Sequence, residues 1–269
     1  MTYWRYWQLN AAPFTGDLQQ PLFRGATVEE ALARIDFLVS NRRSMGMLLG
    51  PSGVGKSSIQ RYLVSNPPAS AELPSVQSTR ISAIGLGPGE LVAILTRQLL
   101  GASAVELTDS TRNWHTLCDY FRASIREEVQ TIVLLDDAES ATQAAHEDVC
   151  RLLSLSFPIT FVLAVEQNLI GAVHRNLLER TDLQIDLPGW EVSQTGEFLA
   201  WSCQRVGRPQ PIFTDRAVEM IQEVSQGVAR RIVQIADLSL VAGAVAQADC
   251  VDADCVQQVI CELPRTAAA

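Results

Sequence analysis

The sequence is poor in lysine, and its charge balance excludes a broadly basic surface. Lys56 is the single lysine among 21 basic residues, and 30 acidic residues give a net charge of −9. With a pI near 4.9, binding of DNA or anionic lipid would need a local basic patch, or arginines contributed by several subunits. DNA is therefore a minority hypothesis.

Metal-binding and membrane-spanning patterns are also missing. The six cysteines form no C-x-x-C pair, and the three histidines share no ligand spacing with them, so we expect no structural zinc site. No stretch approaches 18 uninterrupted apolar residues, and the N-terminus is aromatic and polar. These absences predict a soluble, cytoplasmic protein with reduced cysteines and no membrane span.

Composition and periodicity predict an α/β domain followed by a helical one. The chain has 269 residues, 47% of them hydrophobic and 19% charged, enough to bury one large or two modest cores. Short apolar runs alternate with stretches of helical period, which is typical of a parallel sheet with helices on both faces. The strand pattern stops near residue 189, so we predict an α/β domain over 1–189 and an all-helical domain over 190–269.

The expected elements follow from the same patterns. The predicted strands are 45–49, 79–84, 131–135, 160–165 and 184–187. The predicted helices are 27–41, 56–66, 89–100, 114–129 and 143–154 in the first domain, and 193–206, 214–224, 229–246 and 252–263 in the second. Thr214 and Asp252 suit helix N-termini, because their side-chain oxygens accept hydrogen bonds from free backbone N–H groups.

A glycine-rich segment after the first predicted strand predicts a phosphate-binding loop. Residues 50–57 match the pattern G-x-x-x-x-G-K-[ST], which composition alone would produce in about 5 of 10,000 such chains. Glycines let the backbone wrap a phosphate chain with its N–H groups facing inward, and the following helix adds partial positive charge. We expect Lys56 to reach the β- and γ-phosphates of ATP and Ser57 to hold Mg²⁺. The residues predicted to bind the nucleotide are Gly50, Pro51, Ser52, Gly53, Val54, Gly55, Lys56, Ser57 and Ser58.

A second apolar strand ends in acidic residues. Residues 131–139 have the Walker B pattern, in which we expect Asp136 to hold the Mg²⁺ shell and Asp137 to orient the attacking water. Asp137 is about 1.5 Å shorter than the glutamate common at this place. This predicts slow hydrolysis or a different water geometry. The alternative is that Asp137 and Glu139 only cap the next helix.

With these residues, the chain resembles the AAA+ ATPases of the general secretion pathway A type, whose relatives include ATPase subunits of transposition systems. The resemblance runs nearly end to end, through the aromatic segment 3–9, Pro13-Phe14, residues 28–32, the phosphate loop and residues 135–139. It implies a five-stranded AAA+ sheet with a helical lid, ATP and Mg²⁺ as cofactors, and a homo-oligomeric ring or filament. An unknown protein partner would be remodelled or regulated, with secretion or pilus assembly as one setting.

The resemblance also implies roles for polar residues late in the first domain. Glu166 matches the sensor 1 position, where relatives commonly have Gln. Gln167 is the alternative, because an acid there would repel phosphate. Arg180 matches the arginine finger that reaches the nucleotide of a neighbouring subunit, with Arg175 as the fallback.

In the second domain, residues 227–230 resemble the family's G-x-P-R motif, whose arginine touches the phosphates from the lid. Alanine replaces proline here, which removes a rigid helix start but keeps Arg230. Arg231 is a competitor for this sensor 2 role.

Two questions stay open at the level of sequence. The N-terminal aromatic cluster is either a strap packed on the α/β domain, which we favour, or a surface for a neighbouring subunit or partner. Its members are Trp4, Tyr6, Trp7, Phe14 and Phe23. The leading hypothesis is an ATP hydrolase, and its rivals are a low-turnover nucleotide-gated scaffold and a DNA-associated regulator, with a P-loop kinase less favoured.

Overall fold

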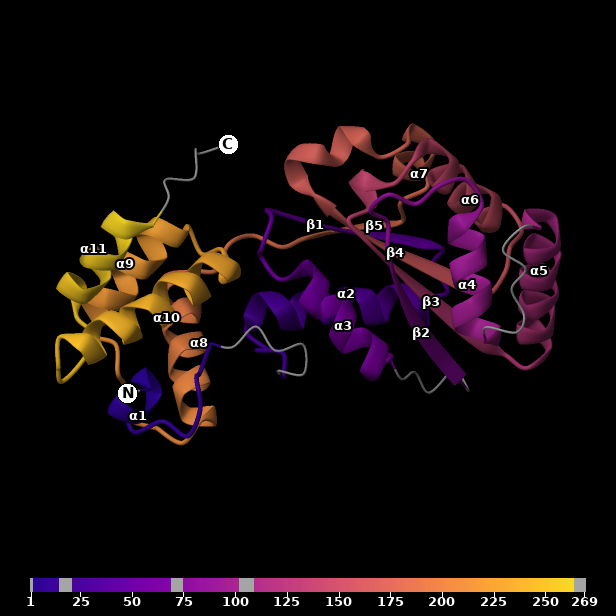
Figure 1. The fold of residues 1–269 in the computed structure, drawn as a ribbon. Helices are drawn as coiled ribbons and strands as arrows, with labels where there is room; N and C mark the ends of the chain where they lie inside the picture. The colour runs from indigo at the N-terminus through magenta and orange to yellow at the C-terminus, as the bar shows by residue number, and fades with distance from the viewer. Residues whose placement is uncertain (1, 15–20, 69–74, 102–108, 264–269) are drawn as a thin grey trace. The chain divides into compact units, whose positions relative to one another are not determined.

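The computed structural model describes residues 2–14, 21–68, 75–101 and 109–263, and the chain forms two compact units (Figure 1). The α/β unit comprises Glu29–Pro51 and Lys56–Leu187. The helical unit comprises Met1–Val28, Ser52–Gly55 and Pro188–Ala269.

The α/β unit is built on five parallel strands in the order β2-β3-β4-β1-β5. They are β1 (Met45–Gly50), β2 (Ser75–Ser82), β3 (Val129–Asp136), β4 (Ile159–Glu166) and β5 (Leu183–Asp186). All five predicted strands are present, so the predicted fold class is confirmed. β2 begins four residues earlier than predicted, because an edge strand tolerates the polar residues at its start.

Helices cover both faces of this sheet (Figure 1). They are α2 (Ala26–Ser40), α3 (Lys56–Ser65), α4 (Glu90–Leu100), α5 (Ser110–Arg126), α6 (Gln143–Leu153) and α7 (Arg175–Glu179), with short 3-10 turns η2 (Ala138–Ser140) and η3 (Gln167–Ala172). The main core joins side chains of β1, β3 and β4 to those of α4, α5 and α6. α2 packs so closely on β1 that a Cβ on Gly46 would lie 2.3 Å from Leu38 Cδ1. α3 is tied to the sheet by Gln60, whose Nε2 donates to the carbonyl oxygens of Leu135 and Val162.

The helical unit contains the four helices that the sequence predicts. They are α8 (Val192–Arg205), α9 (Asp215–Ser225), α10 (Ala229–Val245) and α11 (Ala253–Glu262), preceded at the N-terminus by the single turn α1 (Tyr3–Tyr6). Thr214 Oγ1 accepts a hydrogen bond from Ala217 N at 3.2 Å, and Asp252 Oδ1 accepts one from Cys255 N at 3.0 Å. Both caps therefore begin their helices as expected.

The N-terminal aromatic segment belongs to the core of the helical unit, so the prediction that it packs on the α/β domain was wrong. Trp7 is 1% exposed, and its Nε1 donates to Leu240 O at 2.8 Å. A Cβ on Gly243 would lie 2.8 Å from Trp7 Cζ2, so this glycine makes room for the ring on α10. Tyr6 Oη also donates to Ala248 O at 2.8 Å. Four short helices bury little apolar surface by themselves, and the aromatic side chains complete their core.

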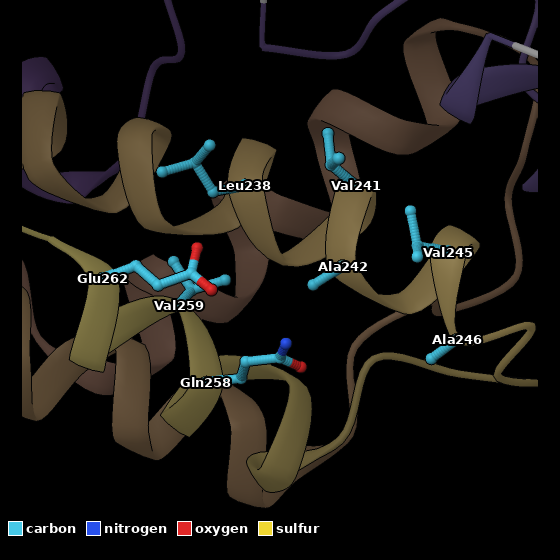
Figure 2. Close-up of a pocket in the computed structure, with 8 residues that line it drawn as sticks. All are labelled: Leu238, Val241, Ala242, Val245, Ala246, Gln258, Val259 and Glu262. Carbon is cyan, nitrogen blue, oxygen red and sulfur yellow. The ribbon is translucent and has the colours of Figure 1, made fainter.

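One face of the helical unit keeps apolar side chains in solvent. Figure 2 shows Leu238, Val241 and Val245 of α10 beside a groove, with Gln258 and Glu262 of α11 on its other side. Val245 is 81% exposed.

Among the described residues, no helix is both long enough and apolar enough to cross a membrane.

Candidate functional site

The glycine-rich loop connects the end of β1 to the start of α3. β1 ends at Gly50 and α3 begins at Lys56, so the lysine ammonium is held at the N-terminal end of a helix. Lys56 Nζ donates to Gly50 O at 2.7 Å and to Pro51 O at 3.0 Å. Two of its three donors thus hold the loop in shape, and the side chain is only 9% exposed.

Two loop glycines have backbone conformations that other residues rarely adopt. Gly53 has φ +83° and Gly55 has φ +117°. A Cβ on Gly55 would meet no atom within 4 Å, so backbone conformation, rather than side-chain packing, requires glycine there. Such a backbone leaves N–H groups free to point at an anion.

Asp136 lies at the carboxyl end of β3 and is 2% exposed. Ser57 Oγ donates to its Oδ1 at 3.1 Å, and Arg80 of β2 forms an ion pair with its Oδ2. A buried carboxylate needs such partners, because its charge has lost the solvation of water. The serine hydroxyl and the carboxylate are hard oxygen ligands, so this pair fits the Mg²⁺ that the sequence predicts.

Asp137 and Glu139 follow Asp136 in a tight turn. Asp137 has φ 50° and ψ 47°, in the left-handed region that strains most residues, and its side chain does not cap η2. Glu139 accepts hydrogen bonds from its own backbone N–H and from that of Glu166, and burial raises the pKa of its carboxyl. Its Oε2 is buried without a hydrogen-bond partner among the described residues. Sequence reasoning treated Glu139 only as a possible cap and missed this placement.

The site as a whole is acidic. Burial lowers the pKa of Lys56, while the surrounding carboxylates oppose that shift. In decreasing order of effect they are Glu139, Glu166, Asp136 and Asp137. Four carboxylates outnumber the positive charges of Lys56 and Arg80 beside them and would repel a nucleotide's phosphates. Bound phosphate here therefore requires further positive charge, which a divalent cation supplies.

The residues matched to sensor 1 lie at the end of β4. Glu166 pairs in register with Gly50, so the structure brings it beside the start of the phosphate loop. Gln167 begins η3 and is exposed. Of the two alternatives, Glu166 is the one whose charge acts on Lys56.

The two candidate finger arginines lie at opposite ends of α7, and both are exposed. Arg175 Nε donates to Glu179 Oε1 at 2.7 Å in an exposed ion pair. Arg180 is the C-cap residue, and within the described part of the chain no ion pair holds it. Of the two arginines, Arg180 is thus the one without an ion-pair partner among the described residues.

Arg230 lies in the first turn of α10 in the helical unit. The same unit contains Ser52–Gly55 of the loop. Arg230 N donates to Gly53 O at 3.0 Å, and its Nη1 lies 3.4 Å from Ser52 Oγ. Arg230, one of the two arginines considered for the sensor 2 role, thus has hydrogen bonds to the phosphate loop.

A parallel sheet with this strand order, a glycine-rich phosphate loop after β1 and a buried aspartate at the end of β3 define a P-loop nucleoside triphosphatase of the AAA+ class. Residues 39–173, half of the chain, match the family described as "AAA domain", so the chain belongs to this family. The resemblance to AAA+ ATPases predicted from sequence is confirmed.

Known proteins support the same class. General secretion pathway protein A of Aeromonas hydrophila is 24% identical, over 89% of this chain and 44% of that protein. The chain thus spans less than half the length of this curated relative. ORC2 of Aeropyrum pernix, solved in ADPNP–ADP complexes, superposes with a TM-score of 0.69 at 18% identity, covering 94% of this chain and 72% of that chain. Drosophila ORC bound to DNA gives a TM-score of 0.67 at 20% identity, covering 97% and 65%. Both structures confirm the fold.

A buried histidine that the sequence analysis did not identify contacts the backbone of the turn that follows Asp136. His146 of α6 is 2% exposed, and its Nε2 lies 2.9 Å from Ala138 O. A carbonyl oxygen only accepts, so Nε2 carries the proton and donates this hydrogen bond. Burial is the main cause that lowers the pKa of His146 below its usual value.

We expect stability to fall with acidification because of His146. Its folded pKa lies below the unfolded value near 6.5, so the unfolded chain binds the extra proton first. Above about pH 6.5, His146 does not change the free energy of unfolding with pH. Below that pH, it lowers the free energy of unfolding as the pH falls, by at most about 1.4 kcal/mol per pH unit. Urea unfolding of wild type and His146→Gln at pH 7.5 and 5.5 measures this.

The glutamine amide can still donate to Ala138 O but does not titrate. The loss of stability on acidification should therefore be smaller in His146→Gln than in wild type, whereas His115→Gln, at an exposed position, should behave as wild type. An identical pH dependence in all three proteins would contradict this role of His146.

Proposed function

We propose that this chain is an ATP- and Mg²⁺-dependent AAA+ ATPase that oligomerises and couples ATP binding and hydrolysis to remodelling or regulating a partner. The observation that carries the proposal is the arrangement of Lys56, Ser57 and Asp136 at the carboxyl edge of the sheet, where parallel α/β sheets bind ligands. Family membership supports nucleotide hydrolysis in general.

The residues proposed to bind the nucleotide have distinct roles. Backbone N–H groups of residues 50–58 would surround the phosphates, with Lys56 on the β- and γ-phosphates and Arg230 as the sensor 2 residue. Ser57 and Asp136 would hold Mg²⁺, which supplies charge neutralisation of the phosphates when bound. Lys56 would then exchange its bonds to loop carbonyls for bonds to phosphate.

Asp137 remains the proposed residue for orienting the attacking water, assisted by Glu166 at the sensor 1 position. Its short side chain and left-handed backbone favour slow turnover. Glu139 is a second candidate, because its carboxyl is longer and partly desolvated beside Lys56. If turnover is negligible, the chain acts instead as a nucleotide-gated scaffold.

The name of the relative from Aeromonas hydrophila supports a role in secretion. A role in pilus assembly and a cytoplasmic location are proposals that rest on the sequence analysis. Binding to DNA is the alternative that the ORC–DNA structure raises. The net charge of −9 favours a protein partner over DNA, because phosphate contacts supply most non-specific DNA affinity.

Replacing Lys56 with methionine should abolish ATP binding. The change removes the only ammonium at the loop but keeps a side chain of similar length, so affinity should fall on the order of 100-fold or more. Equilibrium binding of ATP in excess Mg²⁺ measures the effect. Arg34→Met, which removes one exposed positive charge from α2, is the matched control. Unchanged ATP affinity in a folded Lys56→Met protein would show that the loop is not the site.

If Arg180 acts on the nucleotide of a neighbouring subunit, hydrolysis per subunit should rise with protein concentration. Arg180→Ala should remove that rise and lower turnover at high concentration by at least about tenfold, because a fixed guanidinium stabilises transition-state charge. Turnover from nanomolar to micromolar protein is the measurement. Arg175→Ala serves as the comparison on the same helix.

Two other results of that series would be decisive. Loss of the concentration dependence in Arg175→Ala, but not in Arg180→Ala, would assign the finger to Arg175. Hydrolysis per subunit that is independent of concentration in wild type would contradict a finger acting between subunits, and negligible wild-type turnover would favour the scaffold.

A further inference from the structure

Arg80 is a charged residue at the site that none of the roles above uses. It lies on β2, two residues before Ser82, which is the residue in register with Asp136. Alternate residues of a strand share a face, so Arg80 and Ser82 lie on the same face of the sheet. Arg80 therefore reaches Asp136 from the neighbouring strand.

Both oxygens of the Asp136 carboxylate have a donor. Arg80 Nη2 pairs with Asp136 Oδ2, while Ser57 Oγ donates to Oδ1. Both carboxylate oxygens therefore have donors within the chain. The arginine supplies the positive charge that a 2% exposed carboxylate needs.

The arginine itself is only partly satisfied. Its Nε is buried and has no hydrogen-bond partner among the described residues, and 30% of its side chain is exposed. Asp136 is its one ion-pair partner in the described part of the chain. A buried guanidinium donor without an acceptor weakens the case for a purely structural bridge, and the exposed part leaves a path for the side chain to move.

Two cations cannot share one buried carboxylate without repulsion. A guanidinium on Oδ2 and a divalent ion at the Ser57–Asp136 pair would lie within a few ångströms of each other, in surroundings that screen charge poorly. Binding of one therefore opposes binding of the other.

We propose that Arg80 is a resident counter-ion of Asp136 that is displaced when Mg²⁺ and ATP bind, and that it sets the Mg²⁺ concentration at which nucleotide is retained. The inference rests on the proposed function and concerns the positioning of Asp136. Arg80 orients the buried carboxylate until Mg²⁺ binds, and it makes the chain less sensitive to Mg²⁺ than an unpaired aspartate would be.

The test is binding of a fluorescent ATP analogue, mant-ATP, to the full chain while Mg²⁺ is titrated. Arg80→Gln keeps a hydrogen-bond donor but removes the charge, so the Mg²⁺ concentration at half-maximal binding should fall about tenfold. Arg80→Lys keeps a charge and should stay within about threefold of wild type. Arg97→Gln, at an exposed position on α4, is the control for loss of one positive charge elsewhere.

A midpoint in Arg80→Gln that equals or exceeds that of wild type overturns the proposal, as does an equal fall in Arg80→Lys or Arg97→Gln. Failure of the proposed function looks different, because wild type would then bind no mant-ATP at any Mg²⁺ concentration.

A second measurement uses the wild-type chain, so it does not depend on whether Arg80→Gln folds. In wild type labelled with ¹⁵N-arginine, the guanidinium signal of Arg80, assigned by its absence in Arg80→Lys, should show slowed exchange without ligand. ATP with Mg²⁺ should abolish that protection, while ATP with EDTA should leave it. Protection that persists with ATP and Mg²⁺ overturns the proposal.

Discussion

The buried carboxylate of Asp136 is the constraint on which the rest of the site depends. An acid that is 2% exposed at the end of β3 must be paired with donors or with positive charge. Ser57 meets this need from the start of α3 and Arg80 from β2, so one carboxylate connects three elements. These oxygens also fit a divalent cation, so the contacts that hold the carboxylate in the fold belong to the Mg²⁺ site that we propose.

The local features of this arrangement could be predicted from sequence. A strand followed by glycines and then by a helix places the loop backbone and Lys56 together within eight residues, so no long-range information is needed. Asp136 is recognisable because an apolar strand ends on it. Periodicity and caps predict nine helices, and all nine are present among the described residues. The predicted roles of Asp137, Glu166, Arg180 and Arg230 stay predictions.

Features that depend on pairing between distant segments could not be predicted. Arg80 and Asp136 are 56 residues apart, and nothing in the pattern of β2 shows which strand it will lie against. Trp7 and Leu240 are 233 residues apart, and the aromatic segment reads equally well as a strap on either unit. Glu139 and His146 were missed because their importance lies in burial behind the acidic turn, which periodicity does not report.

Binding of ATP by the loop at Lys56 can be tested by chemical modification, since only Lys56 and the N-terminal amine can react with an amine-directed acylating reagent. Mass spectrometry gives the acylation rate at each position. ATP with Mg²⁺ should slow the reaction at Lys56 at least about tenfold while the N-terminal rate stays unchanged. Equal rates at Lys56 with and without ATP would contradict ATP binding by the loop.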